Sequence, residues 1–296
     1  MAHLFCFGLG YSAEHFLAAF GAVFTPISGT VRSKEKARRV EADGFGGRKV
    51  FPIVFDGEDC NEEVGRTLAT ADAILVSIQP DANGDPVLRC FAEAIARSPA
   101  MSIVYLSTVG VYGDHDGAWV DETTPAKPLS ARSRERLEAE QEWRALAAAA
   151  GKRLAILRLA GIYGPGQNAL VNVMRGSAKR IIKPGQVFNR IHVFDIAQSI
   201  DAAFARRADG LFNVADDEPS AGHEVVAFAA ALLGAPAPPE IEFEEAAKRM
   251  SPMALSFYGE VKRVANAKLK RELGVQLRYP TYREGIRALF EAGGDA

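Results

Sequence analysis

The sequence predicts a doubly wound α/β fold, in which helices cover both faces of a parallel sheet, with a smaller C-terminal lobe. Apolar runs rich in Val, Ile and Leu alternate with helical patterns through the first half of the chain, as expected for strands buried on both faces. A glycine-rich turn joins the first of these runs to the first helix. After Gly164 the alternation gives way to segments punctuated by Pro and Gly, which indicates a second packing unit.

The same patterns give the positions of the individual elements. We expect strands at residues 4–7, 23–31, 50–55, 73–78, 103–107 and 154–159 and helices at residues 33–42, 86–97 and 132–150. Residues 1–164, with returning segments near 187–215, are expected to form the sheet domain. Residues 165–186 and 216–296 are expected to form the smaller lobe.

Composition excludes several classes of protein. The chain has 296 residues, of which 48% are hydrophobic and 24% charged, and its net charge is −2, so neither nucleic acid nor a membrane surface is an expected partner. No apolar run approaches the roughly 20 residues that span a bilayer, and a secretory signal is not expected. Cys6, Cys60 and Cys90 are widely spaced, and we expect them to be buried free thiols in a reducing cytoplasm.

The glycine-rich turn predicts a dinucleotide site. Gly8 allows the chain to turn tightly, Gly10 lets the backbone approach a pyrophosphate, and Ala13 lets the helix pack closely on the strand. The N-terminus of the helix offers unpaired N–H groups and a positive dipole end to phosphates. The residues expected to bind the cofactor here are Gly8, Leu9, Gly10, Tyr11 and Ser12.

The end of the second strand indicates which nicotinamide dinucleotide is bound. A site for NAD places a carboxylate about 20 residues after the glycines, whereas here Arg32 and Ser33 stand at the strand end. A guanidinium group can hold a 2′-phosphate through two hydrogen bonds, and a hydroxyl group can add a third. The sequence therefore favours NADP(H) over NAD(H). The alternative is a solvated basic helix face, which is the interpretation that we prefer for Lys36, Arg38 and Arg39.

Four further segments match patterns of a known family. They are L-S-T-V-G-V-Y-G at residues 106–113, L-R-L-A-G-I-Y-G-P-G at 157–166, R-I-H-V-F-D-I-A at 190–197 and F-N-V-A-D at 212–216. With the glycine turn, they make the chain resemble an extended short-chain dehydrogenase/reductase of the NAD-dependent epimerase/dehydratase family. The resemblance implies a Rossmann-type fold, a nicotinamide cofactor and a small substrate with a hydroxyl or carbonyl group.

The chain departs from this family at its proton-transfer residues. The family uses a Ser or Thr, which Thr108 matches, together with Tyr-x-x-x-Lys on the helix after the fifth strand. Aligned on that helix, Arg132 takes the tyrosine position and Arg136 the lysine position. Arginine stays protonated in proteins, so neither side chain can move a proton at pH 7. Arg136 can still bind a ribose or a phosphate, and the chain resembles an atypical member of the family.

Three other tyrosines are candidates for proton transfer. A literal Tyr-x-x-x-Lys occurs at Tyr258 and Lys262, but it follows all the sheet-forming segments, so we interpret it as a chance match. Tyr112 lies just beyond the fifth strand and is the best remaining phenol, with Thr108 as hydrogen-bond donor. The alternative is that Tyr112 only packs the turn, and Tyr163 is a weaker candidate.

The resemblance also implies further contacts to the cofactor. Asp56 matches a position that places a carboxylate near the adenine amine, with a simple turn residue as the alternative. The end of the fourth strand is expected to run under the cofactor. Its contact residues are Ser77, Ile78 and Gln79.

The segment before residue 195 borders the substrate pocket in the family. Asn189, Arg190 and His192 are therefore candidates to contact an anionic or hydroxylated substrate, although His192 is equally interpreted as a structural histidine. Asp195 is predicted to be a helix N-cap. No spacing of His, Cys, Asp or Glu indicates a metal site.

Two hypotheses about function follow. The first is an NADP(H)-binding oxidoreductase or epimerase-like enzyme with an atypical active site. The second is a non-catalytic NADP(H)-binding module that reports the state of the cofactor to a partner. The resemblance also implies a possible homodimer, paired through helices that include residues 132–150.

Overall fold

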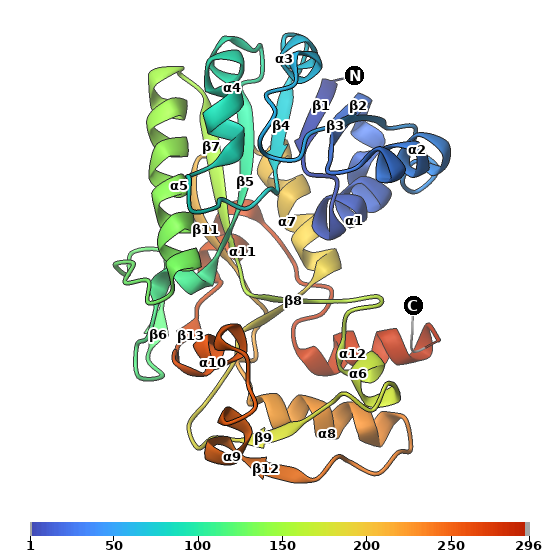
Figure 1. The fold of residues 1–296 in the computed structure, drawn as a ribbon, viewed down its shortest axis with the longest axis vertical. Helices are drawn as coiled ribbons and strands as arrows, with labels where there is room; N and C mark the ends of the chain where they lie inside the picture. The colour runs from blue at the N-terminus through green and yellow to red at the C-terminus, as the bar shows by residue number, and fades with distance from the viewer. Residues whose placement is uncertain (1, 294–296) are drawn as a thin grey trace.

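The computed structural model describes residues 2–293 and contains a seven-stranded sheet with helices on both faces (Figure 1). The strand order is β11-β7-β5-β4-β1-β2-β3, and every neighbouring pair is parallel. From β1 the chain builds the sheet first in one direction and then in the other, which creates a topological switch point between β1 and β4. This is the doubly wound, Rossmann-type sheet that the sequence predicts.

The large sheet consists of β1 (Ala2–Phe7), β2 (Phe24–Val31), β3 (Phe51–Val54), β4 (Ala73–Val76), β5 (Ser102–Thr108), β7 (Arg153–Leu159) and β11 (Gly210–Val214). The helices that cover it are α1 (Tyr11–Phe20), α2 (Lys34–Asp43), α3 (Glu62–Leu68), α4 (Pro86–Arg97), α5 (Ala131–Ala149) and α7 (Val193–Ala205). The short strands are β6 (Trp119–Val120), β8 (Gly161–Tyr163), β9 (Arg180–Ile182), β10 (Arg190–His192), β12 (Glu240–Glu242) and β13 (Arg263–Val264). The other helices are α6 (Ala169–Met174), α8 (Gly222–Leu232), α9 (Phe243–Ala247), α10 (Pro252–Tyr258), α11 (Ala267–Leu273) and α12 (Tyr282–Glu291), and the 3-10 turns are η1 (Gly21–Val23) and η2 (Val109–Tyr112).

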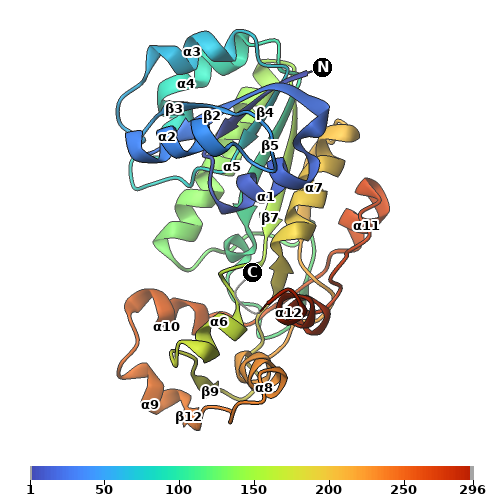
Figure 2. The ribbon, with the colours of Figure 1, turned by 90° about the vertical axis from the view of Figure 1, so that its right-hand side faces the viewer.

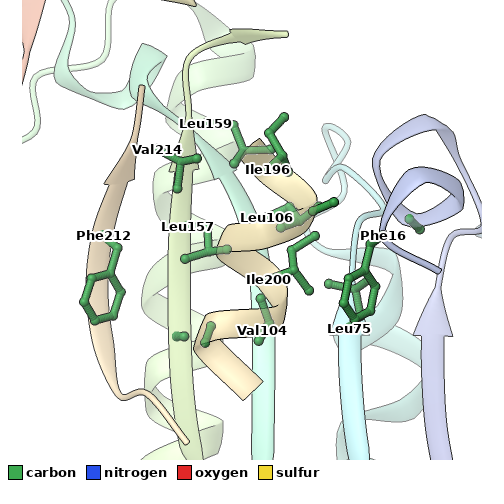
Figure 3. Close-up of a cluster of buried hydrophobic side chains, with 14 of the residues drawn as sticks. Phe16, Leu75, Val104, Leu106, Leu157, Leu159, Ile196, Ile200, Phe212 and Val214 are labelled. Carbon is green, nitrogen blue, oxygen red and sulfur yellow. The ribbon is translucent and has the colours of Figure 1, made fainter. Parts of the chain in front are cut away.

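Alternate residues of β1 are buried on opposite faces of the sheet, as a strand covered on both sides requires. Leu4 and Cys6 belong to the apolar cluster that includes side chains of α1 and α7. Phe5 and Phe7 belong to the cluster that includes side chains of α3, α4 and α5. Figure 3 shows the first cluster, in which side chains of α1 and α7 lie over those of the central strands. Burial on both faces explains why the strands are continuous apolar runs in the sequence.

The carboxyl ends of the parallel strands face the smaller lobe (Figures 1 and 2). A separate apolar cluster holds this lobe together and joins α6, α8 and α12. The last third of the chain contributes to both units, because Leu269 and Leu273 of α11 pack with the first apolar cluster of the sheet. The edge that carries the glycine turn therefore faces the lobe, which is where ligands of open α/β sheets bind. Within residues 2–293, the structure contains no helix whose length and apolar character would let it cross a membrane.

The predicted element ends agree with the structure to within two residues. The helix starts are set by capping side chains. Asp85 accepts hydrogen bonds from the N–H groups of Val87 and Leu88 at the start of α4, at 2.9 and 3.2 Å. Ser33 and Ser130 are the N-caps of α2 and α5, so each of these helices begins one residue after its cap.

The prediction that Asp195 caps a helix is wrong. The N-cap of α7 is His192, whose Nδ1 accepts the N–H of Phe194 at 3.1 Å. Asp195 is fully buried, and its carboxylate accepts the backbone N–H groups of Arg278 and Tyr279 at 2.7 and 3.1 Å. A buried carboxylate needs such donors, and here they come from a segment more than 80 residues away, which the local pattern does not reveal.

The prediction of three buried free thiols is correct for Cys6 and wrong for the other two cysteines. Cys6 is free and buried, and burial raises the pKa of its thiol. Cys60 and Cys90 form a disulfide bond, with their Cα atoms 5.1 Å apart. Cys60 lies in the loop after β3 and Cys90 lies in α4, and the fold brings these segments together although 30 residues separate them. Sequence spacing alone does not show this proximity.

We expect reduction of the Cys60–Cys90 disulfide to lower the free energy of unfolding by about 2–4 kcal/mol, because the bond restricts the unfolded chain. Urea unfolding with and without dithiothreitol measures the difference. A Cys60→Ser/Cys90→Ser variant is the control, since its stability should not respond to the reductant. Equal stability of the oxidised and reduced wild-type protein would contradict this expectation.

Candidate functional site

The turn between β1 and α1 has the backbone conformation that its glycines predict. Gly8 has a φ of 90°, and its N–H donates to Thr30 Oγ1 at 2.8 Å. A Cβ atom on Gly8 would lie 2.8 Å from Ser77 Oγ, so a side chain there would both clash and strain the backbone. A Cβ atom on Gly10 would meet no atom of the described chain within 4 Å, which leaves room for a ligand. No side chain caps α1, so its first N–H groups are available to an anion.

The other residues of the turn hold it in place. Leu9 is buried, and its N–H donates to the Thr30 carbonyl oxygen at 2.8 Å. The Tyr11 hydroxyl donates to the carbonyl oxygen of Pro165 at 2.9 Å, and partial burial raises its pKa to about 12. Ser12 is buried in the first turn of α1. Tyr11 thus ties the glycine turn to the loop that follows β8.

One free positive charge stands at the end of β2. Arg32 is exposed and has no ion-pair partner within residues 2–293. Lys36, one turn further along α2, is instead paired with Glu14 of α1. The Ser33 hydroxyl accepts the N–H of Lys36 at 3.2 Å as the N-cap of α2, and its own hydrogen remains free to donate.

Asp56 forms a turn in the loop after β3. Its Oδ1 accepts the N–H groups of Glu58 and Asp59 at 3.0 and 3.3 Å, and these hydrogen bonds lower the pKa of the carboxyl group. This local role is the alternative that the sequence left open. The carboxylate is exposed, so it has acceptor capacity left for a ligand.

The end of β4 contacts the glycine turn directly. Ser77 Oγ donates to the carbonyl oxygen of Gly8 at 2.6 Å, and Ile78 lies against the same glycine. Gln79, the next residue, extends toward α5, where its Oε1 accepts a hydrogen bond from Arg132 Nη2 at 3.1 Å. The structure therefore brings these three residues together between the glycine turn and α5.

Arg132 and Arg136 of α5 hydrogen-bond to neutral partners. Arg136 Nη1 donates to the carbonyl oxygen of Leu106 at 2.8 Å and to the Tyr105 hydroxyl at 3.3 Å. Thr108, at the carboxyl end of β5, accepts the N–H of Gly110 at 3.1 Å through its side-chain oxygen. That hydroxyl keeps its hydrogen, so Thr108 can still donate to a ligand.

Tyr112 packs the turn, as in the alternative that the sequence left open. Its side chain is fully buried, and its hydroxyl donates to Asn213 Oδ1 at 2.8 Å. Burial raises the pKa of the Tyr112 phenol, against the opposing effect of Arg158, whose guanidinium lies 4.6 Å from the ring centroid. The hydroxyl hydrogen of Tyr112 is therefore already used in a hydrogen bond to Asn213.

A buried ion pair beside Tyr112 was not among the predicted site residues. Arg158 of β7 donates to both carboxylate oxygens of Glu140 on α5, at 3.0 and 2.7 Å, and the Ser107 hydroxyl donates to Glu140 at 2.5 Å. Burial alone would lower the pKa of Arg158, but the hydrogen bonds and charge of Glu140 raise it overall. A signal was present for Arg158 alone, because it is a charged residue inside an apolar strand and inside the segment 157–166.

The literal Tyr-x-x-x-Lys does not form one helix face. Tyr258 is the last residue of α10, and Lys262 lies beyond the end of that helix. The Lys262 ammonium group is buried and donates to the carbonyl oxygen of Gly113 and to Glu260, at 2.8 and 2.6 Å. This geometry agrees with the interpretation as a chance match.

The residues at the predicted pocket border hold the lobe together. Asn189 bridges to the backbone of Lys262 and Val264, and Arg190 Nη1 donates to the Ser220 hydroxyl at 2.7 Å. His192 caps α7, and burial lowers its pKa to about 4, so it is neutral at physiological pH. Tyr163 is buried nearby, and burial raises its pKa.

Comparisons with known proteins agree with this fold. A family model, described as the NAD dependent epimerase/dehydratase family, matches residues 87–215. A functionally unknown conserved protein from Silicibacter pomeroyi is 44% identical over 99% of both chains, with a TM-score of 0.88. Protein YeeZ of Escherichia coli is 26% identical over 280 residues, which are 92% of this chain and 93% of the relative. The dTDP-glucose 4,6-dehydratase of Bacillus anthracis, solved in complex with NAD, is 16% identical with a TM-score of 0.78, over 99% of this chain and 97% of that chain.

The parallel sheet, the glycine turn at its switch point and the lobe over its carboxyl edge define a Rossmann-type α/β protein. Residues 87–215 of the chain match the NAD-dependent epimerase/dehydratase family, and the fold of the whole chain is shared with solved dehydratases. The matched segment carries arginine at residues 132 and 136 of α5.

Proposed function

We propose that the protein is an NADP(H)-dependent, epimerase- or oxidoreductase-type enzyme that acts on a small substrate with a hydroxyl or carbonyl group. The observation that carries this proposal is the glycine turn, where Gly10 leaves open space in front of the uncapped first turn of α1. That turn suits a pyrophosphate, and the unpaired charge of Arg32 at the end of β2 suits a 2′-phosphate. When bound, the cofactor supplies or accepts a hydride.

The residues around this turn take the following roles in the proposal. The backbone from Gly8 to Ser12 binds the pyrophosphate, and Arg32 with the Ser33 hydroxyl binds the 2′-phosphate. The exposed Asp56 carboxylate and the end of β4 line the adenosine side. Thr108 and Arg136 are the residues that we assign to the nicotinamide end of the cofactor.

Proton transfer in this proposal differs from that in an enzyme with a tyrosine–lysine pair. Arg132 and Arg136 stay protonated, so they donate hydrogen bonds to a developing negative charge but do not exchange protons. Thr108 keeps a free hydroxyl hydrogen and is the residue that we assign as donor to the reacting oxygen. We assign no proton transfer to Tyr112, because its hydroxyl is bound to Asn213 in the core.

We expect Arg32→Ala to weaken NADPH binding by about 10- to 100-fold, because charge-assisted hydrogen bonds to the 2′-phosphate are lost. NADH lacks that phosphate, so its affinity should change little. Isothermal titration calorimetry with both cofactors measures the two effects. Arg39→Ala, also on the exposed surface of α2, is the matched control. Tighter binding of NADH than of NADPH to the wild-type protein would contradict the assignment.

A non-catalytic NADP(H)-binding module is the second candidate, because the chain lacks both the tyrosine and the lysine on α5. A panel of carbonyl compounds with NADPH separates the two. Turnover that Thr108→Ala abolishes supports the enzyme, whereas micromolar NADPH binding without turnover of any compound supports the module. The homodimer through α5 and the cytoplasmic location also remain proposals. The disulfide removes the cysteine argument that we made for a reducing compartment.

A further inference from the structure

Arg132 is an exposed arginine whose partners are all neutral. Its Nη2 donates to the amide oxygen of Gln79 at 3.1 Å, and its Nη1 lies 3.5 Å from the thioether sulfur of Met253. A thioether is a weak acceptor, and a guanidinium group has five N–H donors, so most of its donor capacity is left over. No carboxylate in residues 2–293 forms an ion pair with it.

The contacts of Arg132 place it where the sheet meets the smaller lobe. Gln79 follows β4, beside the switch point between β4 and β1. Met253 belongs to α10, which lies in the smaller lobe (Figures 1 and 2). Arg132 therefore stands over the carboxyl edge of the sheet, at the crevice that open α/β sheets use for ligands.

A second unpaired arginine follows one helical turn later. Arg136 lies four residues after Arg132, so both side chains project from the same face of α5. Like charges at this spacing repel each other and destabilise a helix. Arg136 forms no ion pair in residues 2–293, and its hydrogen bonds go to the carbonyl oxygen of Leu106 and the hydroxyl of Tyr105. Neither arginine of this pair is therefore within ion-pair distance of a carboxylate in the described residues.

We propose that Arg132 binds an oxyanion of the substrate, a carboxylate or a phosphate, next to the reacting hydroxyl or carbonyl group. A planar guanidinium group binds such oxyanions through two parallel hydrogen bonds, and Arg132 has the free donors for this. The substrate is then anionic close to its reacting carbon, and Arg132 determines that specificity. This inference rests on the proposed function, because the cofactor site defines which end of the crevice reacts.

The test is a titration of succinate and of inorganic phosphate into the protein, with and without NADPH, at constant ionic strength. Succinamide is the neutral analogue of succinate and should not bind. We expect Arg132→Gln to weaken binding of the preferred anion by about 10- to 100-fold, and Arg132→Lys to restore part of the affinity. Which anion binds more tightly identifies the oxyanion.

Arg134→Gln is the matched control, because Arg134 lies in the same exposed turn of α5 but donates to the Leu129 carbonyl oxygen. Its anion affinity should stay within about twofold of wild type. Equal affinities of wild type and Arg132→Gln, or no anion binding to the wild-type protein, would overturn the inference. Failure of the proposed function has a different signature, namely the absence of NADPH binding while the anion titration still reports on Arg132.

Discussion

Glu140→Ala is expected to lower the free energy of unfolding by about 3–5 kcal/mol, because it leaves the Arg158 guanidinium buried without a counter-charge. Both side chains are almost inaccessible, with exposed fractions of 1% for Glu140 and 5% for Arg158. The substitution also removes the acceptor of the Ser107 hydroxyl. The expected loss of stability is the penalty for burying an unpaired charge, and it is not the net contribution of the ion pair to the free energy of unfolding.

Urea unfolding followed by circular dichroism measures this change. The control is Glu93→Ala, which breaks an exposed ion pair with Arg97 on α4 and should cost less than about 1 kcal/mol. Replacing both Glu140 and Arg158 by Met should recover much of the lost stability, because no charge then remains buried. Similar losses for Glu140→Ala and Glu93→Ala would show that the buried guanidinium is solvated in some other way.

The ion pair also connects the core to the candidate site. It joins α5, which carries Arg132 and Arg136, to β5 through Ser107, the residue before Thr108. We therefore infer that Glu140 and Arg158 fix how the helix with the two arginines sits on the strand that ends at Thr108. These two residues would then position the site without touching a ligand.

The parts of the fold that the sequence predicts are those set by local physics. The apolar run of β1 and the helical patterns at residues 33–42 and 86–97 depend on residues a few positions apart, so the sequence predicts the ends of these elements to within two residues. The glycine turn was predictable for the same reason. Gly8 adopts a positive φ that the residue type itself signals.

The parts that the sequence did not reveal depend on distant partners. The Tyr112 hydroxyl binds Asn213, which is 101 residues away, and the Asp195 carboxylate binds the backbone near residue 278. The disulfide between Cys60 and Cys90 is of the same kind. In each case the residue type limits the possible roles, and only the tertiary fold selects among them. The conformation of the glycine turn could accordingly be predicted from the sequence, whereas the choice between the two roles of Tyr112 could not.

The second large expected effect is a dependence of stability on pH caused by Asp216, which lies where β11 leads into the smaller lobe. Burial raises the pKa of its carboxyl group to about 8, and the nearby Arg190 opposes part of this shift. Its Oδ1 accepts the N–H of Glu218 at 3.2 Å, while its buried Oδ2 has no hydrogen-bond partner in residues 2–293. The native protein therefore keeps this group protonated at neutral pH, whereas the unfolded chain ionises it near its ordinary value of 3.8.

Between pH 4 and pH 8 the native state thus holds a proton that the unfolded state has released, so its stability falls as the pH rises. Asp216→Asn keeps the Oδ1 acceptor and cannot ionise. We expect its stability relative to wild type to rise by about 4 kcal/mol from pH 5 to pH 8, at about 1.4 kcal/mol per pH unit. Urea unfolding at each pH gives this difference. The lowered pKa of His192, which costs stability below about pH 6.5, is common to both proteins and cancels.

Asp114→Asn is the control, because the pKa of Asp114 is shifted in the opposite direction from that of Asp216. The hydrogen bond from the N–H of Val261 lowers the pKa of Asp114, so this carboxyl group is ionised in both the native and unfolded states above pH 5. Its substitution should give a stability difference that does not change between pH 5 and pH 8, whatever its size. A flat difference for Asp216→Asn as well would mean that water or a cation reaches the buried carboxylate. A rising difference for Asp216→Asn alone would show that one buried acid makes the junction of sheet and lobe weaker at alkaline pH.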